Sequence, residues 1–159
     1  TFWMFARLPN YISYVYKKEL HWVPVFGWAL ASMEMMAINR AEGRHAFVQF
    51  MRQGAKFMDD GWWIVLFPEG TRSRTGELGK AAPGALMMAS KALAPIVPAC
   101  VVGTDVFRVG KIWPKVSVRF GKPIYFPKDE PITKEVLKNM TDEMMARIAE
   151  LQAGVKNGN

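Results

Sequence analysis

The sequence is poor in the residues that form disulfides and bind transition metals. Its 159 residues include one cysteine, Cys100, and two histidines. A single cysteine excludes an internal disulfide, so nothing in the chain indicates an oxidising compartment. Two histidines far apart and no cysteine pair do not match a zinc site, and we expect no metal site. Cys100 lies in an apolar run and is expected to be a small core residue.

Long hydrophobic runs are also missing. No apolar stretch approaches the ~18 residues that a transmembrane helix requires, and the sequence shows no signal-peptide pattern. The chain begins at Thr1 and its first residues, T-F-W-M-F, resemble the inside of a core element. We therefore expect the natural protein to continue upstream of Thr1, where a membrane anchor could lie.

Acidic residues are outnumbered by basic ones. The chain has 21 Lys and Arg against 14 Asp and Glu, a net charge of +7. This excess favours an anionic partner, such as a phospholipid surface, a phosphorylated substrate or nucleic acid. No recognised nucleic-acid-binding motif is present, and neither Gly79-Lys80, followed by Ala81, nor Gly121-Lys122, followed by Pro123, fits a P-loop. We therefore expect no nucleic-acid partner.

Apolar periodicity predicts alternating strands and helices, typical of an α/β protein. We predict one domain, residues 1–152, with a mostly parallel central sheet flanked by helices, and a disordered tail at 153–159. The expected strands are 12–17, 36–39, 62–67, 96–102, 116–120 and 123–126. The expected helices are 2–8, 22–33, 47–58 ending at Gly61, one opening at Pro83, and one from Thr133 with Thr141 as an N-cap partway along.

The most informative stretch begins with the apolar run 62–67, whose composition predicts a strand buried on both faces. Pro68 ends this strand because it cannot extend a ladder, and Gly70 permits a tight turn or a close approach to a ligand. Glu69 and Arg72 then add charge at the carboxyl end of the strand, where open α/β sheets bind ligands. The guanidinium of Arg72 suits a phosphate. An ordinary polar surface turn has the same composition.

Residues 67–73, F-P-E-G-T-R-S, resemble the block of that sequence in the glycerolipid acyltransferase family, typified by 1-acylglycerol-3-phosphate acyltransferases. Three further blocks agree in the family's order: K-x-E-L with P-x-x-G-W at 17–28, A-I-N-R at 37–40, and P-I-V-P-A at 95–99. The resemblance covers roughly residues 1–127 and implies a glycerol-3-phosphate acyltransferase-like α/β fold.

The resemblance implies acyl transfer from acyl-CoA or acyl-carrier protein to the free hydroxyl of 1-acylglycerol 3-phosphate, giving phosphatidate in phospholipid biosynthesis. It implies no cofactor beyond the acyl donor, and a location on the cytoplasmic face of a membrane. Two alternatives remain open: an acyltransferase for another lysolipid, and a non-catalytic basic module that binds anionic lipid.

The acceptor site is assigned by this resemblance to Lys17, Arg40, Glu69, Gly70, Thr71 and Arg72. Arg40 and Arg72 would form a clamp on the acceptor phosphate. Gly70 would let the backbone approach, and Glu69 would either bond a glycerol hydroxyl or hold Arg72. Lys17 would either add positive charge or be an exposed strand lysine.

The family's catalytic residues are a histidine and an aspartate in an N-H-x-x-x-x-D block. By the resemblance this block would lie upstream of Thr1. His21 and His45 do not replace it, because Phe26 and Phe50 occupy the aspartate positions. We therefore expect no catalytic residue within these 159 residues, and an inactive fragment.

The segment 22–28 carries three large aromatic side chains, Trp22, Phe26 and Trp28. Such a segment suits a membrane interface, and it suits packing into the core equally well.

Overall fold

The computed structural model describes residues 11–25, 27–29, 35–39, 43–70, 77–82, 84–102 and 116–156, and for residues 17, 155 and 156 the backbone alone. The chain divides into two compact units, Thr1–Thr71 and Arg72–Asn159. Each unit is described by itself. The prediction of one domain over 1–152 stays a prediction, and the helix predicted at 2–8 lies outside the described residues.

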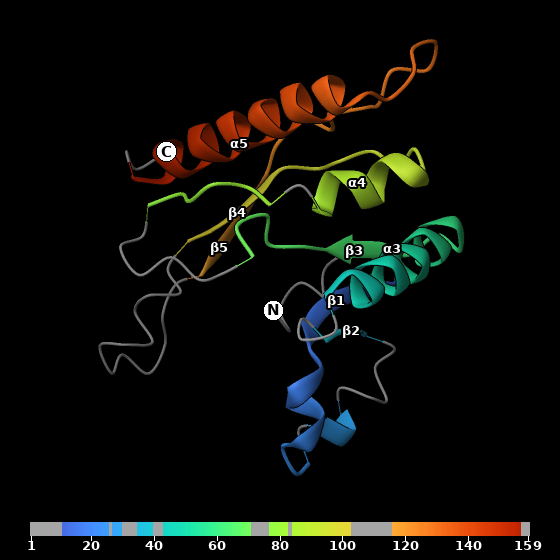
Figure 1. Ribbon diagram of the computed structural model, residues 1–159. Coiled ribbons are helices and arrows are strands. Elements are labelled where there is room, and N and C mark those ends of the chain that lie inside the picture. Colours follow the sequence, from blue (N-terminus) through green and yellow to red (C-terminus); the bar gives the residue numbers. More distant parts are fainter. Residues whose placement is uncertain are drawn as a thin grey trace. The chain divides into compact units, whose positions relative to one another are not determined.

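The first unit contains a three-stranded parallel sheet in the order β2-β1-β3 (Figure 1). The central strand β1 (Ile12–Lys17) pairs with β2 (Met36–Ile38) and with β3 (Trp63–Val65). Val15 lies opposite Met36, and Ile12 lies opposite Trp63. Because both pairings are parallel, all three strands end at the same edge of the sheet.

The strand covered on both faces is β1, and not the predicted strand at 62–67. Ile12, Ser13 and Tyr14 of β1 are buried in succession, as in a strand covered on both faces. The prediction that 62–67 is buried on both faces is wrong, since β3 spans three residues and Trp63 is 40% exposed. Among the described strands β3 pairs with β1 alone, and the edge position explains its exposure.

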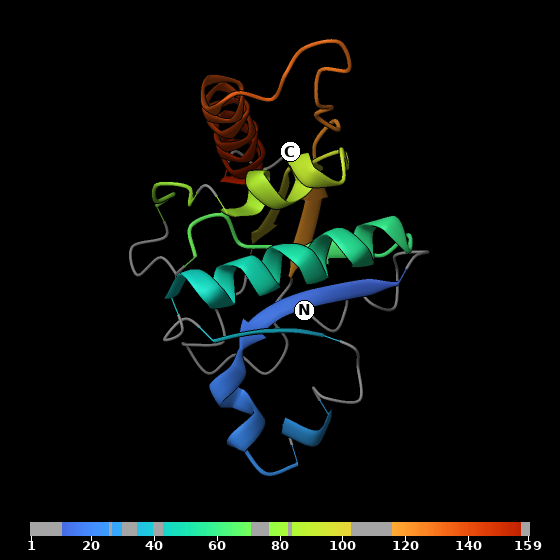
Figure 2. The ribbon, with the colours of Figure 1, turned by 45° about the vertical axis from the view of Figure 1, so that its right-hand side comes forward.

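Helix α3 (Gly43–Asp59), predicted at 47–58, runs along the sheet in Figure 2 and packs on β2 and β3, with Ala46, Phe50, Met51 and Gly54 buried. The helix ends just before Gly61, the residue predicted to terminate it. Gly61 has φ 83°, its N–H bonds Met58 O at 3.0 Å, and Trp62 N–H bonds Phe57 O at 2.8 Å. These two bonds form a Schellman motif, which satisfies the last carbonyls of the helix.

The segment between β1 and β2 differs from the single helix predicted at 22–33. A 3₁₀-helix, η1 (Lys18–Trp22), follows β1 directly, and residues 27–29 form a separate helical turn. Val25 between them has φ 65°, which a continuous right-handed helix does not allow. Residues 30–34 lie outside the described part of the chain.

The second unit contains an antiparallel pair, β4 (Ala99–Val102) and β5 (Ser117–Phe120), with Ala99 opposite Phe120. The predicted strand 96–102 is shortened to β4, and the predicted strand 123–126 is wrong, because within it only Ile124 pairs, in an isolated bridge with Ile96. Pro98 and Pro123 explain the interruption, because proline has no N–H to give to the ladder.

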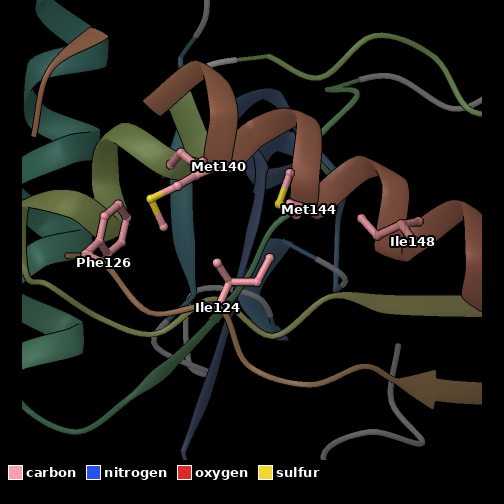
Figure 3. Close-up of a cluster of buried hydrophobic side chains, with 6 residues drawn as sticks. Ile124, Phe126, Met140, Met144 and Ile148 are labelled. Atoms are coloured by element: carbon pink, nitrogen blue, oxygen red, sulfur yellow. The ribbon is translucent and has the colours of Figure 1, made fainter. Parts of the chain in front are cut away.

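In the second unit, helix α4 (Gly84–Lys91) packs against helix α5 (Lys134–Lys156), and α5 also packs on β4. Met140, Met144 and Ile148, one turn apart on α5, point towards Ile124 and Phe126 (Figure 3). Leu86 of α4 completes this buried cluster, which is the core of the unit.

The ends of α5 correct two predictions. Thr133, not Thr141, is the N-cap: its Oγ1 accepts a hydrogen bond from Val136 N–H at 3.2 Å. Thr141 lies inside the continuous helix, where its hydroxyl donates to Leu137 O at 2.7 Å. The helix continues to Lys156, although a disordered tail was predicted from residue 153. Residues 157–159 lie outside the described part of the chain.

The prediction of an α/β protein with a parallel sheet flanked by helices is confirmed for the first unit by β1, β2, β3 and α3. The β4–β5 pair departs from the predicted parallel arrangement.

Candidate functional site

The carboxyl edge of the parallel sheet is the candidate site. Lys18 follows β1, Asn39 follows β2, and the turn 67–70 lies just beyond β3. Lys17 lies opposite Ile38, so β1 and β2 end level with each other. In open α/β sheets this edge is where ligands bind, because loops from neighbouring strands converge there.

A tight turn follows β3. Gly70 N–H bonds Phe67 O at 3.0 Å, which closes a four-residue turn with Pro68 and Glu69 at its centre. Proline favours the second position of such turns because its φ is already fixed. Gly70 has φ 67°, a left-handed conformation that glycine adopts without steric cost. The predicted turn, and the need for glycine in it, are confirmed.

The predicted site residues are only partly within the described chain. Glu69 is half-buried and, with Gly70, lies in this turn. Lys17 is the last residue of β1, and its side chain is outside the described residues, as are Arg40, Thr71 and Arg72. The phosphate clamp of Arg40 and Arg72 therefore stays a prediction.

A small open pocket of about 140 Å³ lies at the same edge. It is lined by residues that follow β1 and β2: Lys18, Glu19, Trp22 and Asn39. Complete small-molecule sites usually measure ~300 Å³ or more, so this pocket has the size of a subsite. Sequence reasoning assigned no role to Lys18, Glu19 or Asn39, although the first two belong to the K-x-E-L block and Asn39 to the A-I-N-R block.

His21 is held by a neighbouring phenol. The Tyr16 hydroxyl and His21 Nε2 are hydrogen-bonded, and the two ring centroids lie 5.3 Å apart. Burial raises the pKa of Tyr16 further above the neutral range, so the phenol is protonated there. Within the part of the chain that the structure describes, the hydrogen-bond partner of the His21 ring is thus a phenol. His45 is exposed in the first turn of α3.

Cys100 is buried in β4 of the second unit, opposite Arg119 of β5. Burial raises the pKa of the Cys100 thiol, and the positive charge of Arg119 opposes this shift. A buried, protonated thiol is a poor nucleophile. The burial confirms the prediction of a core cysteine.

Among the residues that the structure describes, no group of three or more His, Cys, Asp or Glu residues is arranged to hold a metal ion. Among the helices described, none is long and apolar enough to cross a bilayer.

Comparison with known proteins gives consistent results. A family model described as Acyltransferase matches residues 1–102. The 1-acyl-sn-glycerol-3-phosphate acyltransferase of Pseudomonas aeruginosa is 38% identical over 106 residues, which are 67% of this chain and 39% of the relative. The Haemophilus influenzae protein of the same name is 31% identical over 159 residues, covering 95% of this chain and 64% of the relative.

The crystal structure of the 1-acyl-sn-glycerophosphate acyltransferase PlsC from Thermotoga maritima is similar to this chain with a TM-score of 0.62 at 25% identity. The match covers 89% of this chain and 57% of that one. The chain thus spans less than two thirds of each of these relatives. The family model nevertheless matches well over half of the chain, so the chain belongs to the acyltransferase family.

Proposed function

We propose that the protein transfers a fatty acyl group from acyl-CoA or acyl-carrier protein to the free hydroxyl of 1-acylglycerol 3-phosphate, giving phosphatidate. One observation carries the proposal: β1, β2 and β3 each lead into a sequence block of the family, and all three strands end at one edge. The names of the relatives from Pseudomonas aeruginosa and Haemophilus influenzae support the choice of acceptor.

In this proposal the guanidinium groups of Arg40 and Arg72 bind the acceptor phosphate through paired, charge-assisted hydrogen bonds. The turn at Gly70 brings backbone close to the acceptor, and Thr71 lies between this turn and Arg72. Glu69 either bonds the glycerol or holds Arg72. Lys17 adds positive charge, and so does Lys18 in the pocket beside it.

The chemical step needs a base. The acceptor hydroxyl attacks the thioester carbonyl, its proton goes to the base, and the carrier thiol leaves with a proton. We propose that this base is the histidine of the family's N-H-x-x-x-x-D block, outside these 159 residues. In support, His21 is hydrogen-bonded to Tyr16, His45 is exposed on α3, and Cys100 is buried.

The position of the base can be tested with a labelled acyl group. The purified 159-residue chain should show no transfer from acyl-CoA to 1-acylglycerol 3-phosphate above background, whereas the complete natural protein should turn over. Changing the block histidine to alanine in the complete protein should abolish turnover. Robust transfer by the 159-residue chain would locate the base within it and contradict the proposal.

The clamp is tested in the complete natural protein with Arg72→Ala and Arg40→Ala. Each change removes charge-assisted hydrogen bonds worth roughly 1.5–3 kcal/mol, so kcat/KM for 1-acylglycerol 3-phosphate should fall on the order of tenfold to a hundredfold. Arg52→Ala, on the exposed side of α3, is the matched control and should leave kcat/KM unchanged.

The decisive comparison uses a phosphate-free 1-acylglycerol as a second acceptor. The two variants should lose most of the preference for the phosphate-bearing acceptor. An equal loss with both acceptors would mean that these arginines do not bind phosphate. Preference of the unaltered protein for a lysolipid with another head group would favour the other lysolipid acyltransferase activity instead.

We also propose that the protein works on the cytoplasmic face of a membrane. The acceptor is a lipid, and the chain carries a net charge of +7. Cytoplasmic leaflets carry anionic lipid that attracts basic proteins.

A further inference from the structure

The segment between β1 and β2 exposes large apolar side chains. Trp22 is 88% exposed, Trp28 is 74% exposed and Val25 is 72% exposed. Leu20 and Val23 beside them are also exposed. Isolated exposed hydrophobic residues are common, but five within nine positions form a patch that usually marks an interaction site. Packing into the core, left open by the sequence, is therefore wrong for Trp22 and Trp28.

Backbone contacts hold this segment in shape. Val23 N–H bonds Leu20 O at 3.2 Å, Gly27 N–H bonds Val23 O at 2.7 Å, and Ala29 N–H bonds Val25 O at 3.0 Å. A Cβ atom on Gly27 would lie 2.1 Å from the carbonyl oxygen of His21, so the backbone at residue 27 lies directly against the backbone at residue 21. The exposed side chains are thus presented by a closed loop, which we call the tryptophan loop (residues 18–29).

The conformation of Val25 is a second observation on this loop. Its φ of 65° is rare for a β-branched residue and costs about 1–3 kcal/mol. Such a conformation persists only where its surroundings enforce it, and it is frequent at functional sites. Here it brings a third apolar side chain to the exposed surface between Trp22 and Trp28.

The chemistry of the loop fits a lipid head-group layer. Tryptophan is enriched at the level of lipid head groups, because its ring is apolar and its N–H needs a polar partner. Lys18 of the same loop is exposed, and the chain's net charge of +7 suits anionic lipid.

The loop is also continuous with the candidate site. Trp22 belongs to the exposed patch and lines the pocket at the carboxyl edge, together with Lys18, Glu19 and Asn39. Figures 1 and 2 both show η1 continuing from the carboxyl end of β1, away from the sheet, with the turn at 27–29 beside it. A surface that bound this loop would therefore lie next to the site.

We propose that the tryptophan loop docks the protein on an anionic phospholipid surface, with Trp22, Val25 and Trp28 among the head groups. This inference rests on the proposed function, because docking brings the carboxyl edge of the sheet to a lipid acceptor that stays in its bilayer. The acceptor then needs to move only a short way to reach the site.

The experiment uses the complete natural protein and attaches an environment-sensitive fluorophore at one position. The fluorophore reports on its own surroundings, so membrane contacts elsewhere in the protein do not change its signal directly. The label is attached through Trp28→Cys, in a background with Cys100→Ala and no other accessible cysteine. The matched control carries the label at Tyr125→Cys, a similarly exposed aromatic position (71%) outside the loop. Vesicles contain phosphatidylglycerol and phosphatidylcholine, with or without a spin-labelled lipid.

With vesicles, the label at position 28 should shift to the blue, be quenched by the spin-labelled lipid and be protected from aqueous iodide. The label at position 125 should remain open to iodide. Iodide access at position 28 on bound protein would overturn the proposal. Protection that depends on protein concentration and not on vesicles would also overturn it, since the occupant would then be a second copy. None of these readings uses acyl transfer, so they are independent of the proposed reaction.

A paired variant measures the contribution of the loop. Val25→Asn with Trp28→Ser keeps Trp22 in the pocket, and asparagine tolerates the conformation of Val25. Partition of the complete protein into vesicles should fall on the order of tenfold, because two apolar side chains no longer leave water. Tyr125→Ser should leave partition unchanged. Equal partition of the paired variant and the unaltered protein would contradict the inference.

Discussion

Replacing Gly27 by alanine should disrupt the tryptophan loop. An added Cβ would lie 2.1 Å from the carbonyl oxygen of His21, 2.6 Å from its carbonyl carbon and 2.9 Å from its Cα. All three are backbone atoms, so no side-chain rotation relieves the contact. The His21 carbonyl oxygen must retreat by 0.9 Å before the distance reaches 3.0 Å, the shortest that Cβ contacts normally show.

Two opposing effects set the stability change of Gly27→Ala. Residues 27–29 are helical, so the higher helix propensity of alanine would by itself stabilise the folded state by about 1 kcal/mol. Overpacking against backbone typically costs about 1–3 kcal/mol. A shift of His21 also strains its hydrogen bond with Tyr16, which contributes about 1 kcal/mol. We expect a net destabilisation of about 1–3 kcal/mol, concentrated in the loop.

Two measurements on the complete natural protein test this prediction. Denaturant unfolding reports the change in global stability, and hydrogen exchange reports the loop directly. Exchange should accelerate between residues 18 and 29 and stay unchanged in α5. If the loop opens independently, the local effect will be larger than the global one.

Gly154→Ala is the matched control. Gly154 is also helical, within α5, and an added Cβ would meet only the end of the Arg119 side chain at 3.4 Å. This variant should be as stable as the unaltered protein, or more stable by up to about 1 kcal/mol. If Gly27→Ala behaves in the same way, with unchanged exchange in the loop, the close approach of Gly27 and His21 does not exist and the reasoning fails.

Two further predictions concern the second unit. Thr133→Ala should lower the free energy of unfolding by about 1 kcal/mol because it removes the N-cap of α5, whereas Thr141→Ala, inside the helix, should change it by less than about 0.5 kcal/mol. The reverse order in denaturant unfolding would mean that α5 starts at Thr141. Met144→Ala, in the core against Ile124 and Phe126, should cost about 2–5 kcal/mol. Exposed Asp142→Ala should cost far less, and equal midpoints for the two variants would contradict the packing of α5.

Features that depend on a short stretch of sequence were predicted correctly. Strand β1 and helix α3 were predicted from apolar residues at the spacing of a strand and of a helix, which is a local signal. Gly61 and Gly70 were predicted at a helix end and in a turn, and both adopt left-handed conformations there. Glycine is the residue for which these conformations cost least, so its position is informative without any knowledge of neighbours.

Predictions that depended on neighbours were less accurate. The run 62–67 is more apolar than 12–17, yet β1 is the buried central strand and β3 lies at the edge of the described sheet. Hydrophobicity favours a strand but does not choose its partners. Thr141 has the residue type of an N-cap, but the preceding turn of α5 is already helical from Lys134 and Thr133 occupies the cap.

The sequence by itself determined the family resemblance, the α/β class, and the strand-and-turn structure that contains Glu69 and Gly70. Each depends on residue types at fixed spacing along the chain, which no fold can alter. Only the tertiary structure decided that β1, β2 and β3 end at one sheet edge, and that Trp22 and Trp28 are exposed and not packed in the core. Those outcomes depend on which surfaces come together when the chain folds, and the hydrophobic effect is non-directional, so it does not specify which partner covers an apolar side chain.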